Sequence, residues 1–153
     1  MSVATLVAAA CSGFLLAVLW MDLMFDGQVV AHRRSGELPE PVLASIAAYY
    51  HRAVTTSRPM SALVAAVMVI LLAALAVRAV RGDDPGWLVA SLAVSAGVPI
   101  LLALTRTVPN AVRLGKRSDP AATQTRLARA IFRDHVVCFG LMSTFLVLLV
   151  STS

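Results

Sequence analysis

Four long apolar runs constrain what this chain can fold into. They cover about residues 3–25, 60–80, 87–104 and 131–150. Each run is close to or above the length that a helix needs to cross a hydrocarbon core of about 30 Å. Short connections between the runs favour antiparallel neighbours. We therefore predict an all-α, antiparallel four-helix bundle that forms a single transmembrane domain over residues 1–153.

The composition agrees with an integral membrane protein. Of the 153 residues, 59% are hydrophobic and 14% are charged, and the mean hydropathy is +0.83, which is too apolar for a soluble domain of this length. The first run carries no Lys or Arg before Asp22 and is longer than the apolar core of a secretory signal. We therefore expect it to remain as the first helix of the mature protein.

The basic residues predict an orientation in the membrane. Of the 13 Lys and Arg residues, four lie between the first two runs, seven lie from the end of the third run to the start of the fourth, and two lie at the end of the second run and directly after it. The positive-inside rule then makes segments 26–59 and 105–130 cytoplasmic and both termini extracytoplasmic. This distribution indicates a multi-pass protein of the cell membrane, with lipid and not nucleic acid as its partner.

Both cytoplasmic segments contain further helix signals. Between residues 42 and 56, apolar side chains recur at helical spacing, which predicts an additional helical stretch leading into the second crossing. Asp119 and Pro120 suit the N-cap and first position of a helix. We therefore expect the last helix to begin in the cytoplasm and to enter the membrane near Ile131.

Polar side chains accompany the cytoplasmic end of every predicted crossing. Asp22 and Asp26 are four residues apart, so they share one face of the first helix. Charged groups at membrane depth are costly and usually point into the bundle, where they pair or serve a function. We expect one polar layer, to which the other crossings contribute His51, Asn110, Asp134 and His135.

Three interpretations of this layer remain open. Two carboxylates on one helical face with imidazoles from other helices could bind iron, manganese or zinc, and the candidate ligands are Asp22, Asp26, His51 and His135. A carboxylate and a histidine in a partly desolvated pocket could instead move protons on a lipophilic molecule. The third interpretation is structural, with Asp22 or Asp26 paired to Arg129 or Arg133.

The C-terminal third carries two short motifs, in "TRTVPNAVRLG" and "IFRDHVVCFG". They resemble the anthrone-oxygenase-like family of small four-helix membrane proteins, which has a Pro-Asn motif after the third helix and an aromatic-x-x-His motif opening the fourth. The family pattern more often has tryptophan in place of Phe132 and arginine in place of Cys138. The resemblance implies an oxygenase-like activity on a hydrophobic, phenolic substrate, with Asn110 and His135 at the site.

The sequence thus predicts an oxygenase-like membrane oxidoreductase that acts on a lipophilic small molecule at a cytoplasmic-side polar pocket. The catalytic candidates are His135, Asp22, Asp26 and Asn110, and the substrate-binding candidates are His51, Tyr50, Arg129 and Asp134. The cofactor is left open between none and a transition metal. The alternatives are a proton- or ion-handling membrane protein and a non-catalytic accessory subunit of a larger membrane complex. For its own assembly, the chain could form a homo-oligomer or join a larger membrane complex.

Overall fold

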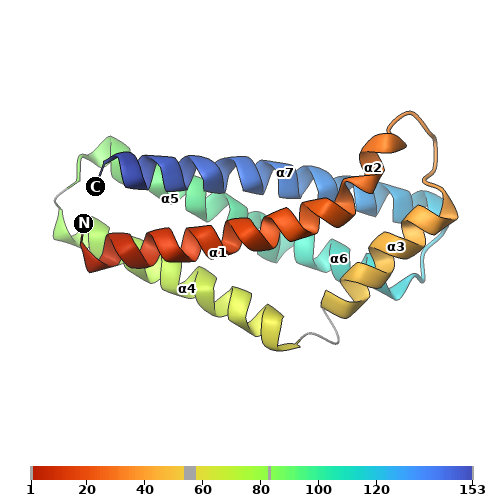
Figure 1. The fold of residues 1–153 in the computed structure, drawn as a ribbon, viewed down its shortest axis with the longest axis horizontal. Coiled ribbons are helices and arrows are strands. Elements are labelled where there is room, and N and C mark those ends of the chain that lie inside the picture. Colours follow the sequence, from red (N-terminus) through yellow and green to blue (C-terminus); the bar gives the residue numbers. More distant parts are fainter. Residues whose placement is uncertain (1, 54–57, 83, 153) are drawn as a thin grey trace.

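Long helices running side by side form the body of the protein (Figure 1). The computed structural model describes residues 2–53, 58–82 and 84–152, and each element in these ranges is helical. The all-α prediction is confirmed. In chain order the elements are α1 (Val3–Asp26), α2 (Gln28–Ala31), α3 (Glu40–His51), α4 (Arg58–Arg81), α5 (Gly86–Leu102), the π-helical turn η2 (Ala103–Thr107), α6 (Val108–Lys116) and α7 (Ala121–Ser151).

Four helical stretches are long and apolar enough to cross a membrane. They are Val3–Ala31, Pro59–Arg81, Gly86–Lys116 and Ala121–Ser151, and each contains one of the predicted crossings. Large apolar side chains remain exposed along these helices, with the densest row on α4. A multi-pass membrane protein accounts for this surface, because lipid tails are the solvent in which such side chains are stable.

The long helices pack around α1 and α7. These two lie along each other for most of the bundle, while α4 packs on α1 and α5 packs on α7. Both termini lie at one end, which we call the terminal end, and α2, α3, α6 and the start of α7 lie at the other, which we call the basic end (Figure 1). Which end faces the cytoplasm remains a prediction.

Two separate apolar clusters hold the bundle together. One fills the terminal half between α1, α4, α5 and α7, with Phe145 and Leu71 fully buried. The other lies at the basic end between α3, α6 and α7, with Ile46, Leu114 and Ile131 fully buried. On α7, His135 lies between the residues that belong to these two clusters, so apolar packing on both sides fixes its position.

The third crossing runs further than predicted. The chain stays helical from Gly86 to Lys116 and does not leave the helix at about residue 104. Pro99 lies inside α5, where it has no amide hydrogen to donate to the preceding turn. A few residues later the helix widens into η2, a π-helical turn of the kind that often marks functional positions.

The helical stretch in the first long segment is α3, which begins at Glu40 and ends at His51. The predicted stretch ran to residue 56, and its last residues, 54–56, lie outside the described ranges.

The last helix begins at Ala121 with Pro120 at the cap, one residue later than predicted. Asp119 does not cap it, because its carboxylate accepts two hydrogen bonds from Arg113, at 2.8 and 2.7 Å. These bonds also lower the pKa of Asp119.

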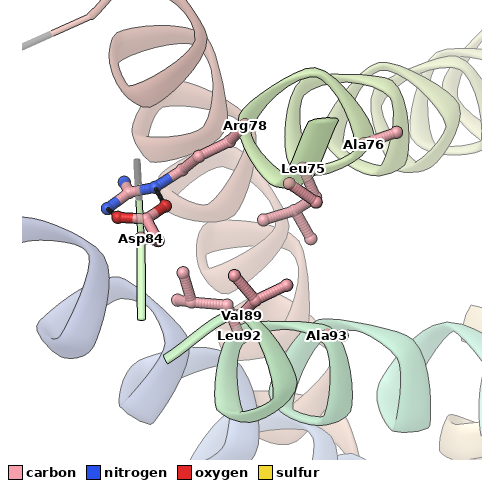
Figure 2. Close-up of a pocket in the computed structure, with 8 residues that line it drawn as sticks. Leu75, Ala76, Arg78, Asp84, Val89, Leu92 and Ala93 are labelled. Carbon is pink, nitrogen blue, oxygen red and sulfur yellow. Dashed lines mark hydrogen bonds and ion pairs between the residues drawn. The ribbon is translucent and has the colours of Figure 1, made fainter. Parts of the chain in front are cut away.

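A partly buried ion pair closes the terminal end. Arg78 of α4 binds the carboxylate of Asp84 in the α4–α5 connection through Nε and through Nη2, the latter at 2.9 Å from Oδ1 (Figure 2). Its Nη1 also donates to the Thr5 hydroxyl of α1 at 3.3 Å. The hydrogen bonds from Arg78 lower the pKa of Asp84. The pair lies beside an apolar hollow lined by Leu75 and Val89, and it ties α4 to α1.

The contact between α3 and α6 can be tested at Gly115. A Cβ atom there would lie 2.9 Å from the backbone nitrogen of His51, so Gly115→Ala must push the two helices apart. We expect the free energy of unfolding in detergent to fall by about 1–3 kcal/mol. Gly140→Ala is the matched control, because a Cβ there meets nothing within 4 Å, and it should be neutral or stabilising by about 0.5–1 kcal/mol. Equal thermal stability of the two variants would contradict this packing.

Candidate functional site

A fully buried carboxylate lies at the centre of the site. Asp26, near the end of α1, has no exposed surface. Its Oδ1 accepts a hydrogen bond from the Tyr50 hydroxyl of α3 at 2.7 Å, and its Oδ2 lies 2.7 Å from Nδ1 of His135 on α7. Three helices that are far apart in the sequence therefore meet at one side chain.

A second carboxylate lies one helical turn away on α1. Asp22 accepts a hydrogen bond from the Tyr49 hydroxyl at 2.6 Å, and its Oδ2 is 3.7 Å from Nε2 of His135. Its side chain is 17% exposed, whereas that of Asp26 is 0% exposed. Asp22 is therefore the carboxylate of the pair that another molecule can reach.

His135 lies between the two carboxylates, with one ring nitrogen toward each. An ionised carboxylate only accepts hydrogen bonds, so Nδ1 must carry the proton that it shares with Asp26. That leaves Nε2 as the nitrogen that can gain or lose a proton, close to Asp22. Asp22, at 3.7 Å, can balance a positive charge on the ring when Nε2 gains a proton, and Asp26 keeps the ring oriented.

Neighbouring contacts explain why α3 brings both tyrosines to α1. The ring of Tyr49 stacks on Phe25 of α1, with centroids 4.1 Å apart and planes 12° apart. Gln28 donates to the Ser45 hydroxyl at 3.2 Å, which fixes the next turn of α3 against the start of α2. The adjacent tyrosines then reach two aspartates that are one turn apart on α1.

The two phenols remain hydrogen-bond donors because they stay protonated. Burial is the main cause that raises the pKa of both Tyr49 and Tyr50 well above the usual value, and the negative charges of Asp22 and Asp26 raise it further. A tyrosine that cannot lose its proton can only donate to the carboxylate it faces. The phenols therefore stabilise negative charge on both aspartates.

Two adjoining pockets open beside His135 and Asp22. The smaller has a volume of about 130 Å³, and the larger has a volume of about 330 Å³, which is at the lower end for ligand pockets. Together we call them the acid–histidine cavity. Apart from His135 and Asp22, the lining that they share is almost entirely apolar: Val18, Val64, Met68, Ala103 and Val108, with Thr107 as its further polar member.

Thr107 adds an unpaired hydroxyl to this cavity. It is the last residue of η2, and it is 4% exposed. Its Oγ1 is buried and has no hydrogen-bond partner among the described residues. A threonine inside a helix usually bonds a carbonyl of the preceding turn, and a buried hydroxyl without a partner is costly. Thr107 therefore offers the cavity a donor and acceptor that the protein itself does not use.

Two predicted substrate-binding residues lie outside the cavity. Asp134 is buried, and its Oδ2 lies 3.2 Å from Nε of Arg106, which is an ion pair without hydrogen-bond geometry. Arg129 donates to the backbone carbonyls of Ser35 at 2.6 Å and of His32 at 3.3 Å. Both residues join α7 to neighbouring segments, and neither lines the acid–histidine cavity.

His51 and Asn110 also lie away from the cavity. His51 is exposed at the end of α3, where its backbone packs on Gly115. Asn110 is half-buried in the first turns of α6, although its neighbours Thr107, Val108 and Ala111 line the larger pocket. The polar layer is therefore narrower than predicted: of the predicted site residues it joins Asp22, Asp26, Tyr50 and His135.

The interpretation in which an aspartate of the first helix pairs with Arg129 or Arg133 is wrong. Asp22 and Asp26 are held by tyrosines and His135, while Arg129 binds carbonyl groups. Helix α1 is still tied to α7, but through an imidazole and not through a guanidinium. An imidazole can exchange a proton near neutral pH, which a guanidinium cannot.

The metal interpretation gains no support from this geometry. Within the described ranges, no group of three or more His, Cys, Asp and Glu side chains is arranged to hold a metal ion. Of the predicted ligands, Asp22, Asp26 and His135 are instead engaged with each other and with the tyrosines. The fourth, His51, does not line the cavity.

Sequence reasoning missed two residues of the site, Tyr49 and Thr107. Tyr49 was not among the predicted site residues, yet it is half-buried beside Asp22. The sequence did contain a signal for Tyr49: two adjacent tyrosines on one helix can each reach one of two aspartates that are one turn apart on another. Thr107 gave no signal, because its unpaired state depends on the π-helical turn.

Comparison with protein-family models, with curated proteins and with solved structures found no match to this chain. The function must therefore be argued from the site itself.

The two tyrosines of the chain, both in this cluster, allow a test by pH titration. Their raised pKa values mean that the folded protein keeps both phenolic protons above about pH 10, where an unfolded chain loses them. The free energy of unfolding should therefore fall as the pH rises beyond about 10. Absorbance and circular dichroism, recorded together in detergent, should show tyrosinate appearing only as helicity is lost.

Exposed tyrosines would behave differently in the same titration. A tyrosinate signal that develops near pH 10, about one pH unit or more before the helices are lost, would contradict the burial and pairing of the phenols. The single variants Tyr49→Phe and Tyr50→Phe assign the signal to one residue.

Proposed function

We propose that this membrane protein binds a lipophilic molecule with an acidic hydroxyl or carbonyl group in the acid–histidine cavity and transfers a proton to or from it. The observation that carries the proposal is the position of His135, whose Nδ1 faces a fully buried carboxylate and whose Nε2 borders a mostly apolar pocket. A histidine whose one ring nitrogen is held by a buried carboxylate, and whose other ring nitrogen faces a pocket, is suited to general acid–base catalysis.

The lining of the cavity supports a lipophilic ligand with one polar group. Most of its lining is aliphatic, and the polar groups common to both pockets are Asp22, His135 and the unpaired hydroxyl of Thr107; the larger pocket is also lined by Tyr49, Tyr50 and Ser61. Ligand sites commonly combine a large apolar wall with a few polar groups that fix orientation. Exposed residues of α4 and α5–η2, Met60 and Leu104, line the edge of the larger pocket, so a molecule dissolved in lipid would enter there.

The roles of the residues follow from their contacts. Asp26 holds the Nδ1 proton of His135 and stabilises the imidazolium that forms when Nε2 accepts a proton from the ligand. Asp22 lies 3.7 Å from Nε2, which is close enough to balance the positive charge of the imidazolium. Thr107 would donate to the oxygen that becomes negative, because its hydroxyl has no other partner in the described ranges.

The oxygenase-like activity is a narrower form of this proposal and rests on the family resemblance. It would require that the deprotonated, electron-rich ligand then reacts with dioxygen. His135 matches the family motif and borders the cavity, whereas Asn110, the other matched residue, does not line it. Oxygen consumption by the purified protein with a lipophilic phenol separates the two forms, since proton transfer alone consumes no oxygen.

The proposal can be tested with 2-naphthol, a lipophilic phenol whose absorption spectrum differs between its neutral and ionised forms. Detergent-purified wild type should bind it and hold part of it as naphtholate at neutral pH. His135→Gln should keep binding but lower the naphtholate fraction by about tenfold or more, because the proton acceptor is gone. Val64→Trp should weaken binding by about tenfold or more, because Val64 lines both pockets and the indole would occupy the space that they share.

Leu72→Trp is the matched control for the filled cavity, because Leu72 is exposed on the same helix and lines neither pocket. It should bind naphthol as the wild type does. Equal binding of naphthol by Val64→Trp and Leu72→Trp, or a wild-type naphtholate fraction in His135→Gln, would contradict the proposal. A chain that binds no naphthol and is stable only within a larger membrane complex would favour the accessory-subunit alternative.

A further inference from the structure

A hollow lined by three arginines lies at the basic end, on the side of α7 away from the acid–histidine cavity. Arg126, Arg129 and Arg133 line it, with Thr125 and Gly36, and its volume is about 310 Å³. At 100° per residue these arginines share one face of α7, roughly opposite the face that carries His135. The hollow is therefore a feature separate from the cavity described above.

The positive charge of this hollow is not neutralised from within. No carboxylate lines it, and the nearby Asp119 is already held by two hydrogen bonds from Arg113. Arg133 has no ion pair or hydrogen bond in the part of the chain that the structure describes, and Arg126 bonds only the Thr123 hydroxyl, at 3.4 Å. Arg129 and Arg133 thus have no carboxylate partner in the described ranges, and Arg126 has only the charge of Asp119, which Arg113 already binds.

Arg129 adds a specific donor to this charge. Its Nη atoms bind the backbone carbonyls of His32, Ser35 and Gly36, which fixes the side chain in place. Its Nε is buried and has no hydrogen-bond partner within the described ranges. A fixed guanidinium with an unused N–H, beside the exposed guanidinium groups of Arg126 and Arg133, is a suitable binding site for a phosphate group.

The depth of the hollow in the membrane indicates where the phosphate would come from. Helix α7 ends at Ser151, and a hydrocarbon core of about 30 Å takes up roughly 20 residues of a helix. The core would therefore end near Ile131 at the basic end. Arg133 then lies at the edge of the hydrocarbon, and Arg129 and Arg126 lie one and two turns further out, at the level of lipid headgroups.

We propose that this hollow binds the phosphate of an anionic phospholipid. Arginines at headgroup depth attract anionic lipid, and the forked guanidinium matches phosphate oxygens. The lipid would hold the turn before α3 against α7, because Gly36 and Arg129 line the same hollow. This site does not depend on the proposed proton transfer, so either can fail without the other.

Native mass spectrometry of the full chain in detergent tests the proposal. With phosphatidylglycerol, the wild type should retain one lipid per chain, and with phosphatidylcholine it should retain much less. Arg126→Gln/Arg133→Gln should lower the affinity for phosphatidylglycerol by roughly 20-fold, because each arginine near an anionic surface contributes a few-fold to binding. Both side chains are exposed, so the variant should fold.

Arg34→Gln/Arg52→Gln is the matched control, because it removes two exposed arginines from the same end that do not line the hollow. It should change the affinity by less than about threefold. Equal losses in the two double variants, or no loss in Arg126→Gln/Arg133→Gln, would overturn the site. If millimolar inorganic phosphate displaces the lipid completely, the ligand of the hollow is free phosphate and not a phospholipid.

Discussion

The arrangement of the basic end depends on how one buried carboxylate is satisfied. Taking an ionised carboxyl group out of water costs several kcal/mol unless hydrogen bonds and charge compensate it. Asp26 is fully buried and receives its donors from Tyr50 and His135. Because these donors come from α3 and α7, the need to satisfy one side chain of α1 brings three helices to a common point. The same contacts orient the imidazole toward the cavity, so the requirement that organises the helices also prepares the candidate site.

The sequence was sufficient for the crossings and for the polar layer, because both follow from general physics. Apolar length predicts a membrane span, and the cost of charge at membrane depth predicts that Asp22, Asp26 and His135 turn inward. The hydrogen-bond partners of these side chains depend on how each helix is rotated and packed, and no local sequence pattern predicts that. The π-helical turn brings Thr107 to the cavity, while Asn110, three residues further on, does not line it. Arg129 could be expected to pair with an aspartate, yet it binds the carbonyls of a turn whose path only tertiary packing decides.

The two faces of α7 carry different kinds of polar side chain. One face carries His135 and borders the acid–histidine cavity, where burial and carboxylates favour proton transfer. The other carries Arg126, Arg129 and Arg133, which line the hollow that we propose to bind lipid phosphate. At the far end of the bundle, Arg78 and Asp84 close the connection between α4 and α5. The cavity lies between these ends, and α1, α4, η2 and α7 line it.

Nitrogen-15 NMR of the histidine side chains tests the central claim most directly. The account predicts that Nδ1 of His135 carries a proton in the wild type, and that Nε2 is the nitrogen that loses or gains one. In Asp26→Asn the amide can donate to Nδ1, so the proton should move to Nε2. His32 and His51, the other two histidines of the chain, provide internal references that this substitution should leave unchanged. A His135 that is unprotonated at Nδ1 in the wild type, or whose tautomer does not change in Asp26→Asn, would contradict the account.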